Sequence, residues 1–402
     1  MIGVDQALNL VEQWARQLPE KRVSLREALG LRLAEPIVSE VDSPPFDKSL
    51  LDGYAVATHD ANRERKVIEQ VIAGGVPHHA VEPGTTILVM TGAPVPDGAD
   101  TVYKHEDVKQ VDSTTIRLPK SGIEQGSGIL LRGAAFHAGQ EVLSLGRSLS
   151  PVDIALLAEV GHAKVLVTPP PRVAVLPTGN ELVASGRPIG PGQICNSNGP
   201  MLLALLEAFG AKVMDLGIGR DDPDELRRLM EQGLEADIFL VTGGVSAGVM
   251  DLVPGVLKDL GAQEVFHKVR IKPGKPLWFG QRESEGRRTL IFGLPGNPVS
   301  TLVSFEIFVK PALLALCGDG FVTASPVRGV LQAPVQHRGA RPTYYPCRVE
   351  FGQREEGKPC VTPIPWRGSA DLGALTGANA LAIFPQGDYE LETGANVDVL
   401  SL

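Results

Sequence analysis

Glycine-rich loops are the first places in this sequence where chemistry could occur. Residues 238–253, IFLVTGGVSAGVMDLV, run from an apolar stretch into a loop that supplies Gly243, Gly244, Ser246, Gly248 and Asp251. Glycine allows positive φ and a close approach of the backbone to a phosphate. No Lys-Ser or Lys-Thr pair follows the glycines, so this is not a P-loop. Taken alone, the loop is explained equally well as a tight turn before a helix.

Four further loops of similar composition lie beside predicted strands. They are LPTGNEL with Glu181, NSNG with Asn198, GRDDP with Asp221, and LPGNP with Pro295 and Pro298. Asp222 before Pro223 has the sequence of a helix N-cap, which leaves Asp221 without a structural role. Ligands of open α/β sheets bind beyond the carboxyl ends of the strands. Convergence of several such loops therefore favours a ligand site.

Charged residues near these loops suggest what the ligand is. The segment 267–276, HKVRIKPGKP, supplies Lys268, Lys272 and Lys275. Lys268, Arg270 and Lys272 alternate, so on a strand they would share one face. A solvated face is the alternative, but the chain carries a net charge of −9, and a local cation cluster then favours a phosphate or oxyanion ligand.

Carboxylates from the same loops indicate a metal ion. Glu181, Asp221 and Asp251 are the candidates. Mg²⁺ is usually held by one or two carboxylates together with phosphate oxygens. Asp251 could instead cap the helix that follows it.

A second group of polar loops lies earlier in the chain. SPPFDKSLLDGYAV contains Asp52, and VMTGAPVPDGAD contains Thr91 with a free hydroxyl. A hairpin turn is the simplest explanation of the Asp-Gly pair. GVSAG, residues 244–248, matches the spacing of a nucleophile elbow, but no later acid and histidine lie in matching loops. A hydrolase is therefore the weaker hypothesis.

Composition excludes several classes of protein. The 402 residues include 43% hydrophobic, 21% charged and 5% aromatic residues, which is typical of a soluble protein and unlike a nucleic-acid binder. Four widely spaced cysteines form no CxxC pair, which disfavours a zinc site and suits a reducing compartment. We see no signal peptide and no apolar run long enough to span a membrane. The sequence predicts a cytoplasmic protein that binds neither nucleic acid nor membranes.

Hydrophobic periodicity divides the chain into regions. Helical spacing predicts a helix over 4–17, and short apolar runs between Gly, Pro and Asp clusters predict a β-rich insertion over 41–131. Strands and helices alternate over 171–321, which predicts a three-layer α/β domain with a mostly parallel sheet. We predict a multidomain α/β protein. Its domains are a helical and β linking domain (1–40 with 132–170), the insertion, the α/β domain and a small C-terminal β-barrel (322–402).

Nine motifs in this order closely resemble the molybdopterin molybdenumtransferases, called MoeA in bacteria and represented in animals by the gephyrin E domain. Besides those quoted above, they include NSNGPML, GRDDPDEL, KVRIKPGKPLWFG and the late RGSADLGAL. The resemblance covers roughly residues 3–400. It implies that the α/β domain is of the molybdopterin-binding type and that the protein is a dimer with a site shared across chains.

The resemblance also implies a reaction and roles for particular residues. The family binds adenylylated molybdopterin and molybdate with Mg²⁺, inserts the metal into the dithiolene and releases AMP. Matched by motif, the functional positions here are Asp52, Thr91, Glu181, Asp221, Asp251, Lys268, Lys272, Lys275, Pro295, Pro298, Arg348 and Ser369. A molybdopterin adenylyltransferase and acceptor molybdoenzymes are the implied protein partners.

One departure from the family pattern concerns a run of acids. Where the family usually has Arg-Gly-Glu-Asp, this chain reads Arg132, Gly133, Ala134, Ala135. An acid of the usual ligand set is therefore absent. We expect an active enzyme, and the alternative is a weakly active or non-catalytic molybdopterin-binding scaffold of the same fold.

Overall fold

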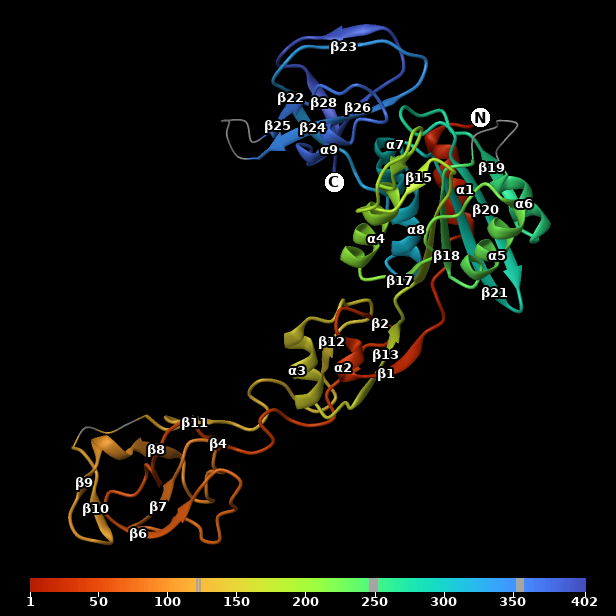
Figure 1. Ribbon diagram of the computed structural model, residues 1–402. Helices are drawn as coiled ribbons and strands as arrows, with labels where there is room; N and C mark the ends of the chain where they lie inside the picture. The colour runs from red at the N-terminus through yellow and green to blue at the C-terminus, as the bar shows by residue number, and fades with distance from the viewer. Residues whose placement is uncertain (121, 123, 246–251, 352–357) are drawn as a thin grey trace. The chain divides into compact units, whose positions relative to one another are not determined.

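The computed structural model describes residues 1–120, 122, 124–245, 252–351 and 358–402. The chain forms two compact units: residues 1–21 with 168–402, and residues 22–167 (Figure 1). This division is coarser than the four predicted domains, whose boundaries stay a prediction. Helix α1, Val4–Trp14, buries Ala7 and Val11 in the core of the first unit. The predicted linking domain had combined residues 1–40 with residues 132–170 instead.

A mixed sheet is the centre of the first unit. Its strand order is β17-β14-β18-β21-β20-β19. The strands are β17 Lys212–Asp215, β14 Arg172–Pro177, β18 Ile238–Thr242, β21 Arg287–Leu294, β20 Trp278–Ser284 and β19 Gln263–His267. The first four are parallel and β20 runs antiparallel. Every residue of β18 is buried, as expected for a parallel strand covered on both faces.

Helices cover both faces of this sheet (Figure 1). One core joins the sheet to α1, α4, α7 and α8, and a second joins its other face to α5 and α6. The helices are α4 Asn198–Phe209, α5 Pro223–Gly233, α6 Val253–Asp259, α7 Pro298–Ser304 and α8 Lys310–Leu316. The predicted three-layer α/β domain is therefore confirmed.

A π-helical segment, η2 Phe305–Val309, joins α7 to α8 in one continuous helix, Pro298–Leu316. Among the described residues this is the one helix long and apolar enough to cross a membrane. Its most apolar window is 83% buried inside the protein. A buried core helix has the same composition, because it is surrounded by apolar side chains.

The C-terminal region forms the predicted small barrel. Its closed strand order is β22-β25-β24-β26-β28. The strands are β22 Val327–Leu331, β24 Thr343–Glu350, β25 Cys360–Pro363, β26 Ala380–Phe384 and β28 Asn396–Ser401. A separate antiparallel pair is formed by β23 Val335–His337 and β27 Tyr389–Leu391. The short helix α9, Leu372–Thr376, follows the segment that contacts α7. Tyr344, Leu381 and Leu400 join the core of the α/β domain.

The second unit contains the β-rich insertion and the linking elements. The insertion forms a sheet of order β8-β5-β7-β6-β10-β9, and its strands are β5 Gly53–Val56, β6 Glu64–Val71, β7 Thr85–Val89, β8 Thr101–Lys104, β9 Lys109–Gln110 and β10 Thr115–Arg117. The 3₁₀ turn η1, His105–Asp107, follows β8.

Two short strand pairs and a small sheet make up the rest of this unit. The pairs are β4 Lys48–Ser49 with β11 Ile129–Leu130, and β3 Ile37–Val38 with β12 Glu141–Leu143. The linking sheet has the order β1-β13-β2, formed by Lys21–Ser24, Lys164–Thr168 and Arg32–Leu33, beside helices α2 Leu25–Ala28 and α3 Pro151–Glu159. Ser24 and Glu27 form a capping box at the start of α2.

Phe292 provides a test of how strongly the α/β core depends on packing. Its ring is fully buried and lies 4.9 Å, centroid to centroid, from the ring of Phe279. We expect Phe292→Ala to lower the free energy of unfolding of this unit by about 3–5 kcal/mol, since it leaves a cavity. The three tryptophans, Trp14, Trp278 and Trp366, all lie in this unit. Intrinsic fluorescence in a urea titration therefore reports its unfolding.

The matched control for this experiment is Phe351→Ala. Phe351 is 65% exposed, so its loss should change the unfolding free energy by no more than about 0.5 kcal/mol. Equal losses in the two variants would show that burial of Phe292 is not the cause.

Candidate active site

The loops that follow β14, β18 and β21 meet at one edge of the sheet. The amide of Thr178 donates to the Thr242 carbonyl at 2.7 Å, which joins the first loop to the second. Gly243 has φ of +85°, and a Cβ there would lie 2.4 Å from the Thr178 carbonyl oxygen. Only glycine therefore fits this crossing. A Cβ on Gly296, after β21, would lie 3.8 Å from the Gly243 Cα, so the third loop is adjacent.

Asn198, the first residue of α4, connects a fourth loop to the same edge. Its side-chain Nδ2 donates to the Gly296 carbonyl at 2.7 Å. The residue is 7% exposed, and no described residue forms a hydrogen bond with its Oδ1. A buried acceptor without a donor is unfavourable by about 1–3 kcal/mol. A ligand that donates a hydrogen bond here would relieve that penalty.

The predicted carboxylates Glu181 and Asp221 lie in two loops that are held together. The Asn180 amide donates to Asp221 Oδ2 at 3.2 Å, and the Asp221 amide donates to Asn180 Oδ1 at 3.1 Å. Arg220 donates to the carbonyls of Asn180 and Leu182, on either side of Glu181, at 3.2 and 3.0 Å. Asp222 caps α5 by accepting from the Glu225 amide, as predicted. Asp221, which the sequence left without a structural role, helps to join the two loops through its Oδ2.

The carboxylates of Glu181 and Asp221 suit a Mg²⁺ ion whose other ligands are phosphate oxygens of the substrate and water. Glu181 and Asp221 are both exposed, and among the described residues the one side-chain hydrogen bond to either is that from the Asn180 amide to Asp221 Oδ2. In the part of the chain that the structure describes, no group of three His, Cys, Asp or Glu side chains could hold a metal alone. Two carboxylates completed by phosphate oxygens and water are sufficient for Mg²⁺.

A cavity of about 590 Å³ opens beside the loop that follows β21, and both the α/β domain and the C-terminal region line it. Glu181, Asp221 and Asn198 are not among the described residues that line it. Four of the predicted residues are in its walls: Lys272, Lys275, Pro295 and Ser369. The Asn297 Nδ2 donates to Ser369 Oγ at 2.9 Å, which links the last loop of the sheet to the C-terminal region. Sequence reasoning missed Asn297, Arg341 and Trp366, which also line the cavity. Asn297 lies inside the LPGNP motif, so the motif itself was an available signal.

The strand expected across residues 268–272 is wrong. β19 ends at His267, and Lys268 has φ of +72°. The amide of Val269 donates to the Lys275 carbonyl and that of Arg270 to the Ile2 carbonyl, so the segment is a folded loop. Lys272 and Lys275 reach the cavity through this loop. Lys268 is half-buried and is not among the described residues that line the cavity.

Five further predicted positions are Pro298, Arg348, Ser246, Gly248 and Asp251. Pro298 is the first residue of α7. Arg348 lies on β24, pairs with Glu350 at 3.3 Å and is not among the described lining residues of the cavity. Ser246, Gly248 and Asp251 lie outside the described residues.

In the insertion, Asp52 and Thr91 form one hydrogen-bonded pair. Asp52 Oδ1 accepts from the Thr91 amide at 2.6 Å and from the Thr91 hydroxyl at 2.8 Å. These bonds lower the pKa of the Asp52 carboxyl, and the nearby His105 lowers it further. Asp52 is an exposed residue, and its Oδ2 accepts no hydrogen bond from the described residues. His105, missed from the sequence, stacks on Tyr54 with 5.6 Å between ring centroids.

These features define a multidomain protein whose α/β domain holds a ligand site at the carboxyl ends of its parallel strands. Residues 2–161 match the MoeA N-terminal region (domain I and II), residues 174–315 a probable molybdopterin binding domain, and residues 328–402 the MoeA C-terminal region (domain IV). The chain belongs to the MoeA family.

Whole-chain relatives agree with this placement. The molybdopterin molybdenumtransferase of Staphylococcus aureus strain Mu50 is 34% identical over 408 aligned positions, covering 99% of this chain and 95% of the relative. A molybdopterin biosynthesis MoeA protein of Pyrococcus horikoshii has a TM-score of 0.80 at 31% identity, covering 100% of this chain and 99% of that one. A second structure from P. horikoshii has a TM-score of 0.73 at 30% identity, covering both chains fully. The protein is an enzyme of molybdenum cofactor biosynthesis of the molybdenumtransferase type, and the non-catalytic scaffold is not favoured.

Thr91→Val tests the electrostatics of the Asp52 pair. The variant removes the hydroxyl donor and keeps the amide donor, so the pKa of Asp52 should rise part of the way toward its usual value. Thr91→Ser keeps both donors and should leave that pKa low. Carboxyl ¹³C chemical shifts followed between about pH 2 and 6 measure both. An unchanged Asp52 titration in Thr91→Val would contradict the hydrogen-bond assignment.

Proposed function

We propose that this protein catalyses the Mg²⁺-dependent insertion of molybdate into adenylylated molybdopterin, with release of AMP. The observation that carries the proposal is the convergence of three strand-end loops, the buried Asn198 acceptor and the lysine-lined cavity at one sheet edge. Ligands of α/β domains bind at this edge. The names of the curated relatives supply the reaction type.

The charges of the site suit an anionic substrate. The ammonium groups of Lys272 and Lys275 come from one loop in the cavity wall, where they can neutralise phosphate oxygens as negative charge develops. Arg341, which donates to the Ile271 carbonyl at 2.9 Å, fixes the base of that loop and adds a third cation to the lining. Cleavage of a phosphoanhydride depends chiefly on such positioning and charge neutralisation.

Glu181 and Asp221 are the residues that would hold Mg²⁺. The paired loops keep the two carboxylates oriented through Asn180 and Arg220. When bound, the ion would neutralise pyrophosphate oxygens that the lysines do not reach. We also propose that Asp251 belongs to this set, on the family resemblance alone.

Asp52 and Thr91 are proposed to act from a second chain. Thr91 holds Asp52 ionised with one oxygen free, which suits contact with a metal or a donor group on the substrate. We propose a cytoplasmic homodimer in which this pair completes the site of the partner chain. A molybdopterin adenylyltransferase would supply the substrate, and molybdoenzymes would accept the product.

Two variants test the proposed site. Purified protein with adenylylated molybdopterin, molybdate and Mg²⁺ should release AMP and yield active cofactor. Lys272→Met removes one charge-assisted contact and should lower kcat/KM roughly 10–100-fold; Asp221→Asn should do likewise and raise the Mg²⁺ concentration needed. Lys258→Met, exposed on α6, is the matched control and should retain full activity. Binding of substrate without AMP release in the unmodified protein would reject the transferase function.

The missing acid gives a further prediction. Ala135 is exposed, and its amide donates to the Ser43 carbonyl at 2.9 Å, so a longer side chain can be accommodated without breaking that bond. Ala135→Asp should raise the rate of AMP release, because it restores a carboxylate of the family pattern. Ala135→Asn has nearly the same shape without the charge and should not. A rate equal to that of the unmodified protein in both variants would show that the acid is dispensable here.

A further inference from the structure

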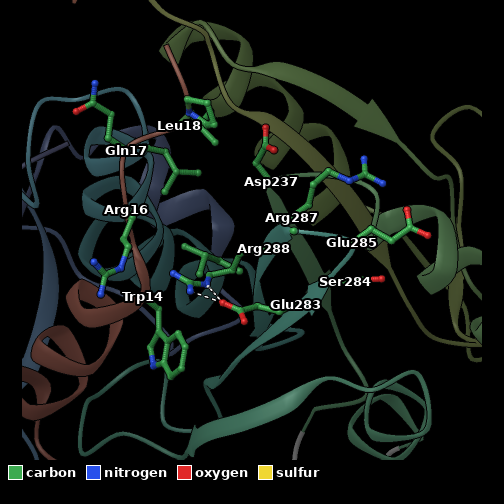
Figure 2. A pocket seen from close by; sticks show the side chains of 14 residues that line it. Trp14, Arg16, Gln17, Leu18, Asp237, Glu283, Ser284, Glu285, Arg287 and Arg288 are labelled. Carbon is green, nitrogen blue, oxygen red and sulfur yellow. Dashed lines mark hydrogen bonds and ion pairs between the residues drawn. The ribbon is translucent and has the colours of Figure 1, made fainter.

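A second cavity lies at the opposite edge of the central sheet, and nothing in the proposed reaction uses it. Its volume is about 530 Å³, within the range of roughly 300–1,000 Å³ typical of small-molecule sites. It lies between the segment that follows α1 and the turn that joins β20 to β21 (Figure 2). Asp237, directly before β18, is in its wall. Asp237 precedes β18 and Arg287 begins β21, whereas the candidate active-site loops follow these strands.

An aromatic ring and buried leucines supply its apolar surface. Leu290 and Leu316 are 2% and 3% exposed and line the cavity. Trp14 is half-buried, and the Arg288 guanidinium carbon lies 5.3 Å from the centroid of its indole ring. This cation–π contact fixes one wall. Because these lining side chains are already ordered, a flat, apolar ligand can pack against them with little loss of side-chain conformational entropy.

The charges that line the cavity balance, with three arginines (Arg16, Arg287 and Arg288) and three acids (Asp237, Glu283 and Glu285), and partners hold several of them. The Asp237 carboxylate accepts from the Arg172 amide at 2.7 Å, and Arg287 pairs with Glu235 at 2.7 Å. Figure 2 shows the Glu285 carboxylate pointing away from Trp14 and Arg288.

Two arginines remain to meet a ligand. Arg16 is exposed, and within the described residues no side-chain partner is found for it. Arg288 donates to Glu283 through Nε at 2.8 Å and through Nη2, and within the described part of the chain no acceptor is found for its Nη1.

We propose that this cavity binds a small aromatic anion: a carboxylate, sulfonate or phosphate on an aromatic ring system. The ring packs against Trp14, Leu290 and Leu316, and the anionic group is met by Arg16 and Arg288. A neutral apolar ligand would make no use of the Arg16 guanidinium or of the Arg288 donors that Glu283 does not take. A cationic ligand would be repelled by both arginines.

The test uses 8-anilinonaphthalene-1-sulfonate, an aromatic sulfonate, titrated into the folded full-length chain with fluorescence detection. We expect saturation at one probe per chain. Arg16→Gln and Arg288→Gln should each raise Kd roughly tenfold, the effect of losing one charge-assisted contact. Arg328→Gln, on an exposed arginine of the barrel, is the matched control and should leave Kd unchanged.

A variant that strengthens binding separates recognition from loss of structure. Glu283→Gln removes the anion that competes for Arg288, so it should lower Kd severalfold, which a damaged fold would not do. Lys272→Met changes the candidate active site and should leave probe binding unaltered. Probe binding that is insensitive to Arg16→Gln and Arg288→Gln, or that is lost in Lys272→Met, would overturn the proposal. AMP release should be unaffected by Arg16→Gln, so this proposal and the proposed function fail independently.

Discussion

The parallel pairing of β14, β18 and β21 is the interaction on which the rest of the structure depends. Leu240 of β18 pairs with Val175 on one side and Phe292 on the other, so three strands end at the same edge. Their backbone groups are satisfied within the ladder, and both faces are covered by helices. Polar atoms can then occur only where the strands end, and the site is built there from Thr178, Gly243 and Gly296.

Close packing of these loops explains the glycines better than direct ligand contact does. Gly243 is required because the Thr178 carbonyl occupies the space of a side chain. Similarly, a Cβ on Gly179 would lie 2.3 Å from Glu181 Oε2, with φ of +146°. The glycines therefore let two loops and a carboxylate come together, and the ligand groups come from neighbouring residues such as Asn198.

Local patterns in the sequence were sufficient for the helices, the buried strands and the position of the loops along the chain. They failed where distant segments decide the backbone. The alternation of Lys268, Arg270 and Lys272 indicated a strand, but pairing of Ile2 with Val269 and the hydrogen bond from Val269 to Lys275 fold the segment into a loop. The unpaired Oδ1 of Asn198 and the arginine-lined cavity also depend on residues far apart in sequence. Periodicity carries no information about such contacts.

The two edges of the sheet differ in the chemistry they offer, and the difference follows from strand direction. At the carboxyl edge, the loops that carry glycines and carboxylates follow the strands, and Lys272 and Lys275 line the cavity beside the last of these loops, which suits an anionic ligand. At the amino edge, the chain enters the strands through charged residues that pair with one another, as Arg287 does with Glu235 and Arg172 with Asp237. Those pairs neutralise part of the charge there, and the cavity offers apolar surface together with Arg16 and with Arg288, which Glu283 holds on one side. One sheet can therefore present two cavities of similar volume with different ligand preferences.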